Sequence, residues 1–317
     1  MKAMQGEVMN EICLVCEGNS WQNFSEVENG KFTLYICKKC SFAQLNPIPT
    51  QEVLDDFYSK LYRDSYSENS AVNADVLAYE QKRADRVVKV IKPYFNKESE
   101  DILDIGCSSG TLLENIEKLS TNATLHGIEM NERYKSYIIE KGIVEKDKVS
   151  SQNINTFYEG QEQKFDFISI VHVLEHLKSP KEALESIYKL LTSDGLLYIE
   201  VPNLKTPYND LRKEYFAIYH LYYFTEYTLG KLLLSIGFKI LHEEQIAGTS
   251  VCFVCQKNVE HRGKTVEDAT QYELVIGALK KYEFNYPVRK HILKLKGNIV
   301  KMLDFLKIKD TIKKIVY

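Results

Sequence analysis

The sequence lacks several features that would restrict its class. No run approaches the roughly 20 consecutive apolar residues of a membrane-spanning helix, and Met1 to Asn10 contain no apolar signal-peptide core. The formal net charge is only -3 over 317 residues, which provides no global field to attract nucleic acid. These absences favour a soluble cytoplasmic enzyme with one large domain and a smaller appendage.

Seven cysteines are present, and in a reducing compartment they argue against a disulfide framework. Four of them form two C-x2-C pairs separated by 20 residues: Cys13, Cys16, Cys37 and Cys40. Four thiolates in two tight pairs are the ligand set of a tetrahedral structural zinc site. A closed shell leaves no open position, so this site is expected to support folding and loop placement rather than catalysis.

Cys252 and Cys255 have the same spacing but lie in an expected strand. Residues three apart on a strand point to opposite faces, so this pair is expected to pack in the core rather than chelate a metal.

Four parts are expected along the chain: a four-cysteine zinc-binding module (1–48), a tyrosine-rich helical connector (49–98), an α/β domain (99–258) and a basic helical tail (259–317). The connector contains Tyr58, Tyr62 and Tyr66, followed by a helix over 72–95. Short apolar strands alternate with amphipathic helices from 101 to 257, which is typical of a doubly wound α/β sheet. Expected strands cover 101–105, 124–130, 148–150, 165–171, 196–201, 239–243 and 251–256; expected helices cover 111–118, 132–141, 180–191 and 228–236.

The segment Asp104-Ile-Gly-Cys-Ser-Ser-Gly110 follows an expected strand and opens an expected helix. Glycines in this context let the backbone approach a nucleotide-type ligand closely. Asp104 can order the turn or accept a hydrogen bond from a ligand ammonium group. Glu129, at the end of the next strand, can accept hydrogen bonds from both hydroxyls of a ribose. These features predict an adenosine-type ligand without separating NAD from S-adenosylmethionine (SAM).

Four motifs resemble those of class I SAM-dependent methyltransferases, in the same order: the 101–110 segment, His126-Gly-Ile-Glu129, the 165–176 segment ending in His172-Val-Leu-Glu-His176, and Leu196-Leu-Tyr-Ile-Glu-Val-Pro202. The resemblance covers residues 54–257 and implies a Rossmann-like, doubly wound seven-stranded sheet. SAM use is favoured over NAD by the 172–176 segment and by the insertion over 204–224. Ser108 stands where the family usually has its middle glycine.

The resemblance implies these cofactor-binding residues: Asp104, Gly106, Cys107, Ser108 and Gly110 around the methionine part, Glu129 at the ribose, Met130 and Asn153 near the adenine, and Val171 and His172 near the sulfonium.

Methyl transfer to a hydroxyl needs a base that removes the proton. His220, within an aromatic stretch, is the first candidate, and His176 and Tyr223 are further catalytic candidates. The alternative for His176 is a structural role, as a helix-capping or core histidine that holds its loop in place. A second possibility is a divalent cation held by His172, Glu175, His176 and His220, because this segment is similar to the Glu-x2-Glu-His metal motif of some RNA 3'-end and quinone methyltransferases.

The four-cysteine module before this domain resembles sugar C-methyltransferases that act on nucleotide-linked keto-sugars. Their further α/β domain is absent here. In those proteins a glutamate directly precedes the histidine, and Tyr219 occupies that position before His220 in this sequence. We therefore expect O-methylation of a sugar or sugar-linked group, such as a nucleotide-linked sugar or glycan precursor. Sugar C-methylation and metal-assisted methylation of RNA or a small molecule are the alternatives.

The tail is rich in lysine, and Ile292, Leu295, Ile299, Met302 and Leu306 recur in it at helical spacing. A packed helix with a solvated lysine face is the simplest interpretation. An interfacial helix at an anionic membrane and a docking or dimer helix fit the same pattern, and nucleic-acid contact is the less favoured option. A SAM-binding or surface-binding module without turnover is the alternative from a different class.

Overall fold

The computed structural model describes residues 12–50, 52–54, 72–98, 100–160, 162–246, 248–257, 268 and 270–305. The connector tyrosines Tyr58, Tyr62 and Tyr66 and the chain beyond residue 305 lie outside this described part. Within it, no helix combines the length and apolar character needed to cross a membrane.

Seven strands form the large sheet in the order β10-β11-β8-β7-β4-β5-β6. The pairs from β8 to β6 are parallel, and β11 and β10 extend the sheet in antiparallel fashion. The bounds are β4 (Asp101–Ile105), β5 (Thr124–Ile128), β6 (Val149–Ser150), β7 (Phe165–Val171), β8 (Leu191–Pro202), β10 (Phe238–Ile246) and β11 (Ser250–Lys257). The predicted doubly wound, seven-stranded class is confirmed, and every expected strand is present.

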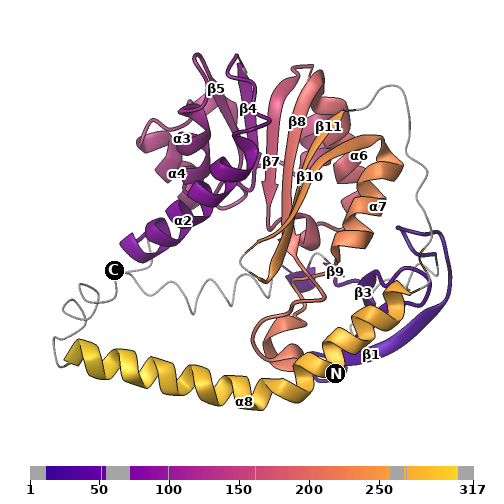
Figure 1. Cartoon of the computed structure of the whole chain (residues 1–317). Coiled ribbons are helices and arrows are strands. Elements are labelled where there is room, and N and C mark those ends of the chain that lie inside the picture. Colours follow the sequence, from indigo (N-terminus) through magenta and orange to yellow (C-terminus); the bar gives the residue numbers. More distant parts are fainter. Residues whose placement is uncertain are drawn as a thin grey trace.

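Helices cover both faces of the large sheet (Figure 1). One face carries α2 (Ala74–Ile91), α3 (Thr111–Glu117) and α4 (Glu132–Glu140), and the other carries α5 (Ile154–Glu159), α6 (Pro180–Leu190) and α7 (Glu226–Ile236). α7 begins two residues before its predicted start because Thr225 and Thr228 form a capping box there. The short α5 was not predicted, since six residues are too few to show helical periodicity.

The chain order places a topological switch point between β4 and β7, at the centre of the large sheet. From β4 the chain builds β5 and β6 on one side, and it then returns to build β7 and β8 on the other. In open α/β sheets, ligands bind outside the carboxyl ends of the strands at such a switch point. The residues that follow β4, β5 and β7 are therefore in position to share one site.

A second, four-stranded antiparallel sheet, which we call the knuckle sheet, lies beside the large one (Figure 1). It has the order β1 (Trp21–Val27), β2 (Phe32–Cys37), β3 (Ala43–Asn46) and β9 (Tyr222–Tyr223). The last strand comes from the insertion that follows β8, far along the chain. The knuckle sheet thus takes strands from both sides of the expected boundary at residue 48.

The expected helical tail is present as α8 (Gln271–Phe305), the helix that runs along the lower edge in Figure 1. Its first turns pack on the knuckle sheet, where Val275, Ile276 and Leu279 share a core with Leu34 and Leu45. Further along, Phe284 is 85% exposed.

The prediction for the second cysteine pair is confirmed. Both residues lie in β11, and Cys252 belongs to the core beneath α2 and α3 while Cys255 belongs to the core beneath α6 and α7. The two thiols therefore face opposite sides of the large sheet.

Candidate active site

The turn that follows β4 depends on the two glycines predicted to face the cofactor. Gly106 and Gly110 have φ angles of 79° and 76°, and a Cβ on Gly106 would lie 2.5 Å from Cγ2 of Val173. The N–H groups of Gly106 and Cys107 donate to the Ile128 carbonyl at 2.8 and 3.2 Å. Only glycine fits the first position, and the turn is fixed against the end of β5.

Glu129, the predicted ribose acceptor, is tied to this turn. Its Oε2 accepts from the Ser108 N–H at 2.8 Å and its Oε1 from the Asn131 N–H at 2.7 Å. Burial raises the pKa of Glu129 and outweighs these backbone bonds, which lower it. Each carboxylate oxygen can accept a second hydrogen bond, so the arrangement is compatible with a ribose, and that role stays a prediction.

Asp104 lies within β4, where it is only 3% exposed. Its Oδ1 accepts from the Ser169 hydroxyl at 2.7 Å, and burial raises its pKa to about 6 despite that bond. This contact joins β4 to β7 behind the turn. Both roles predicted for Asp104, ordering the turn and accepting from the ligand ammonium group, stay predictions.

The two residues expected near the adenine, Met130 and Asn153, are both exposed. Met130 is 68% exposed. Asn153 is also exposed, and its side-chain oxygen caps α5 by accepting from the N–H groups of Asn155 and Thr156. Met130 follows the carboxyl end of β5 and Asn153 follows that of the edge strand β6, and adenine contact stays a prediction for each.

Val171 ends β7 and is buried, while His172 follows it in the left-handed region with φ 55°. The His172 ring lies between two carboxylates, with Nε2 3.1 Å from Glu200 and Nδ1 3.5 Å from Glu175. Burial lowers the pKa of His172, but the two carboxylates outweigh it and raise the pKa to about 9. Glu200, only 1% exposed, was missed in the sequence, where its one signal is a lone carboxylate inside the apolar run of β8.

Three further side chains converge where the β7 segment meets the insertion, and we call Glu175, His176 and His220 the acceptor cluster. Glu175 and His176 lie in the 3-10 turn η2 (Leu174–His176), and one ligand-type atom from each of the three lies within 4.8 Å of the others. Nδ1 of His176 is 2.7 Å from the Tyr219 carbonyl oxygen. Because a carbonyl only accepts, Nδ1 carries a proton, and Nε2 on the other side of the ring lies 3.8 Å from Glu175 Oε1.

The acceptor cluster contains buried polar atoms that make no hydrogen bond within the described residues. Glu175 is 2% exposed and His220 5%; within the described part of the chain, neither Glu175 oxygen nor His220 Nδ1 makes a hydrogen bond. Burial raises the pKa of Glu175, but the nearby imidazoles outweigh it and lower the pKa to about 2. Burial and His176 lower the pKa of His220 to about 4. A carboxylate thus faces a neutral imidazole, and unpaired buried groups of this kind are costly.

Tyr223, the third catalytic candidate, is almost fully buried in β9. Its hydroxyl accepts from the Ala217 N–H at 3.0 Å and lies 3.4 Å from the Tyr215 carbonyl. Its ring meets the His220 ring edge-on, with centroids 5.8 Å apart. These contacts place Tyr223 under the loop that carries His220, while a direct role in the reaction stays a prediction.

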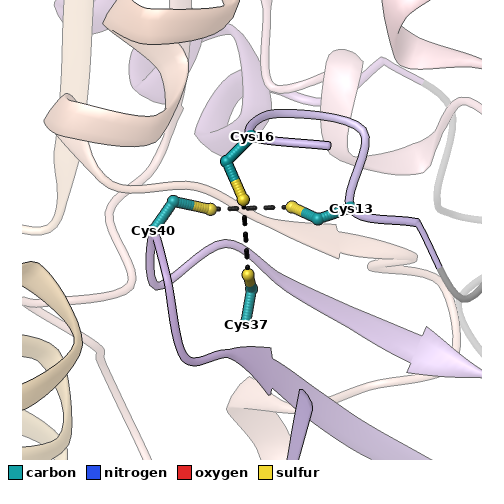
Figure 2. Close-up of side chains that lie close together, drawn as sticks. All are labelled: Cys13, Cys16, Cys37 and Cys40. Carbon is teal, nitrogen blue, oxygen red and sulfur yellow. Dashed lines mark hydrogen bonds between the residues drawn. The ribbon is translucent and has the colours of Figure 1, made fainter. Parts of the chain in front are cut away.

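The four predicted metal ligands Cys13, Cys16, Cys37 and Cys40 bring their sulfur atoms together in one cluster (Figure 2). Cys13 Sγ lies 3.6 Å from Cys40 Sγ, and Cys16 Sγ lies 3.6 Å from Cys37 Sγ. These separations are far longer than a disulfide bond. They match the roughly 3.8 Å between thiolates around a tetrahedral zinc with bonds of about 2.3 Å. The donor set therefore fits a structural zinc ion.

The knuckle sheet is joined directly to the acceptor cluster. Gln44 and Ala43 of β3 pair with Tyr222 and Tyr223 of β9. Next to this pairing, Leu221 accepts from the Leu45 N–H at 3.0 Å and donates to the Glu175 carbonyl at 2.9 Å. One short segment thus bonds both to the four-cysteine module and to η2.

Comparison with known proteins defines the class. A family model described as a methyltransferase domain matches residues 76–243, which is 168 of the 317 residues. The chain belongs to this family of methyltransferase domains, and the predicted class I SAM-dependent methyltransferase fold is confirmed.

Curated relatives are similar over part of their length. The ubiquinone biosynthesis O-methyltransferase of Glaesserella parasuis is 30% identical over 115 residues, covering 32% of this chain and 45% of that protein. The mitochondrial ubiquinone biosynthesis O-methyltransferase of Candida albicans is 32% identical over 113 residues, covering 34% of each. The chain thus spans less than half the length of these relatives. Their names lend no support to the expected sugar acceptor.

Among solved structures, a SAM-dependent methyltransferase from Archaeoglobus fulgidus is 18% identical, with a TM-score of 0.46, covering 63% of this chain and 99% of that one. The N-methyltransferase NodS from Bradyrhizobium japonicum, in complex with S-adenosyl-l-homocysteine, is 15% identical, with a TM-score of 0.44, covering 63% and 97%.

Proposed function

We propose that this protein is an O-methyltransferase that moves the methyl group of SAM to a hydroxyl of a small-molecule acceptor. The observation that carries this proposal is the buried carboxylate of Glu175, whose oxygens make no hydrogen bond among the described residues and lie close to His176 and His220, just after the end of β7. The family supports methyl transfer, and the names of the curated relatives support transfer to oxygen. A hydroxyl of an aromatic or quinone-type precursor is our first acceptor class, and a sugar-linked hydroxyl is the second.

The cofactor side follows the predicted assignments. The Gly106–Gly110 turn would hold the methionine part, Glu129 the ribose, and Val171 would line the floor near the sulfonium. The acceptor oxygen attacks the methyl carbon, the carbon–sulfur bond breaks, and its electron pair stays on sulfur to leave S-adenosylhomocysteine. The hydroxyl proton must go to a base.

His220 is our base. Its low pKa keeps the imidazole neutral at physiological pH, so that unpaired Nδ1 can accept a proton. Glu175 would stabilise the imidazolium that forms, as a buried carboxylate near a catalytic histidine does in hydrolase triads. His176 would hold the loop through its bond to Tyr219.

The acceptor cluster also fits a divalent cation. Glu175 offers an oxygen, His176 offers Nε2, and His220 offers Nδ1, with no competing hydrogen bond to the Glu175 oxygens or to His220 Nδ1 within the described residues. A cation held there would act as a Lewis acid on the acceptor hydroxyl. His172, which the sequence placed in this set, lies between Glu175 and Glu200 instead. In the module, Cys13, Cys16, Cys37 and Cys40 would hold a structural zinc.

The test is methyl transfer from SAM to a panel of polyhydroxylated aromatics and nucleotide-sugars, with each product located by mass spectrometry and NMR. His220→Ala and Glu175→Gln should each lower turnover by about 10²- to 10⁴-fold with SAM affinity nearly unchanged. Glu182→Gln, on the exposed side of α6, is the matched control.

The outcomes separate the alternatives. Loss of turnover on chelation, restored by Mg²⁺ or Mn²⁺ but not in Glu175→Gln, would assign the acceptor cluster as a cation site, whereas full activity after chelation would leave His220 as a base alone. A methyl group found on carbon, or a protein that does not bind SAM, would contradict the proposal.

A further inference from the structure

The middle of the cofactor turn holds a side chain in a backbone conformation that usually requires glycine. Ser108 has φ 48°, in the left-handed region, where a Cβ is disfavoured and glycine is the common choice. A neighbouring contact must offset this cost for the turn to keep its shape.

That contact comes from α2, outside the turn. Glu80 is only 8% exposed, and its Oε1 accepts from the Ser108 hydroxyl at 2.7 Å. Its Oε2 accepts from the hydroxyl of Ser109, which also hydrogen-bonds Thr111, the first residue of α3, at 2.7 Å. Both carboxylate oxygens of Glu80 thus hold consecutive residues of the turn.

The backbone of Ser108 also contacts Glu129, the residue predicted to bind the cofactor ribose. Its N–H donates to Glu129 Oε2 at 2.8 Å. The Ser108 N–H lies in the peptide plane shared with Cys107, and that plane is kept in place only while the turn holds its shape on both sides of it. A change in the Ser108 conformation would move the chain that follows and strain this peptide, so the bond to Glu129 depends on the turn remaining intact. Glu80, Ser108 and Glu129 therefore form one series of contacts from α2 to the proposed ribose position.

We infer that Glu80 is a positioning residue for the cofactor. Ser108 stands where the family usually has a glycine, and Glu80 holds it in the backbone conformation that orients Glu129. This inference rests on the proposed use of SAM. Glu80 acts through the turn and need not touch the ligand, so its effect should be the same for SAM and for S-adenosylhomocysteine.

The test is a double-mutant cycle in the full chain, read by calorimetric titration with both ligands. Glu80→Ala should weaken binding of each ligand roughly tenfold, the loss typical of a hydrogen bond to a charged group. Ser108→Gly alone should change affinity by less than about threefold, because glycine adopts the conformation unaided. The double variant should bind like Ser108→Gly, since glycine no longer needs Glu80.

Two further variants serve as controls, one for the specificity of the effect and one for folding. Gln81→Ala removes a neighbouring contact between α2 and Asn115 of α3 and should leave affinity unchanged. Glu80→Gln preserves size and one acceptor oxygen, so it should fold even if Glu80→Ala does not, and should weaken both ligands by a smaller factor.

Additive losses in the double variant, or an unchanged affinity in Glu80→Ala, would overturn the inference. A loss confined to SAM would also overturn it, because that would indicate attraction between the Glu80 charge and the sulfonium. Wild-type protein that binds neither ligand would instead refute the proposed function.

Discussion

The two halves of the candidate site are built differently. In the cofactor half, the Gly106–Gly110 turn and Glu129 belong to one β-α-β unit, and each Glu129 oxygen accepts a backbone hydrogen bond. In the acceptor half, Glu175 and His220 come from separate segments, and within the described residues both Glu175 carboxylate oxygens and His220 Nδ1 make no hydrogen bond. The polar groups of the cofactor half are therefore held by hydrogen bonds, whereas the acceptor half is arranged to receive a proton, a cation or an acceptor group.

The halves also differ in what supports them. The cofactor half is held by its own turn and by Glu80 of α2, while the acceptor half depends on β9, a strand that pairs with the four-cysteine module. This comparison predicts that damage to the module should impair the acceptor half and spare SAM binding.

The largest expected effect is that of Cys37→Ser. Loss of one thiolate should release the metal, because structural zinc supplies about 10–16 kcal/mol of apparent binding energy to small modules that fold around it. We expect the knuckle sheet to become sensitive to protease and turnover to be lost, with SAM affinity within about threefold of wild type. Metal analysis, limited proteolysis and calorimetry measure these changes. The control variant Cys255→Ala, which changes a core cysteine, should leave the metal content of the protein unchanged. If Cys37→Ser lost SAM binding to the same extent as turnover, the proposed difference between the two halves would be wrong.

The next effect is on the cofactor half. Glu129→Ala removes a carboxylate that orders the turn and is proposed to bind ribose, so the Kd for SAM should rise roughly ten- to hundredfold. Turnover at saturating SAM should change much less, because the acceptor half is untouched. Glu140→Ala, an exposed carboxylate on α4, is the control. An unchanged Kd would contradict the assignment of Glu129.

The smallest effect is expected from Tyr222→Phe. The Tyr222 hydroxyl donates to the Lys178 carbonyl at 2.7 Å and ties β9 to the segment after η2, while its ring stacks on Phe42 and should remain in place. Losing this bond should cost about 1 kcal/mol of unfolding free energy, measured by chemical denaturation, with Tyr137→Phe on the cofactor half as reference. If turnover falls in Tyr222→Phe but not in Tyr137→Phe at a similar loss of unfolding free energy, the result would support a dependence of the His220 position on β9.

The cofactor half was predictable because its signals are local. A glycine turn directly after an apolar strand, and a carboxylate at the end of the next strand, are read within about 30 residues. The four-cysteine cluster was equally visible, since metal-ligand spacing is a property of short segments. Glu80 was not, because nothing in an amphipathic helix marks which carboxylate will meet a turn on a neighbouring element.

The sequence alone determined the doubly wound α/β fold with its glycine turn and the four-cysteine cluster, because periodicity, glycine turns and cysteine spacing act over short stretches of chain; the methyltransferase class followed from the resemblance of its motifs to that family. Only the tertiary structure decided that β9 completes the knuckle sheet, that the buried Glu175 oxygens lie near His220 without a hydrogen bond among the described residues, and that His172 lies between Glu175 and Glu200. These facts depend on which distant segments come together, and burial, charge pairing and orphaned hydrogen-bonding atoms exist only after the chain has packed.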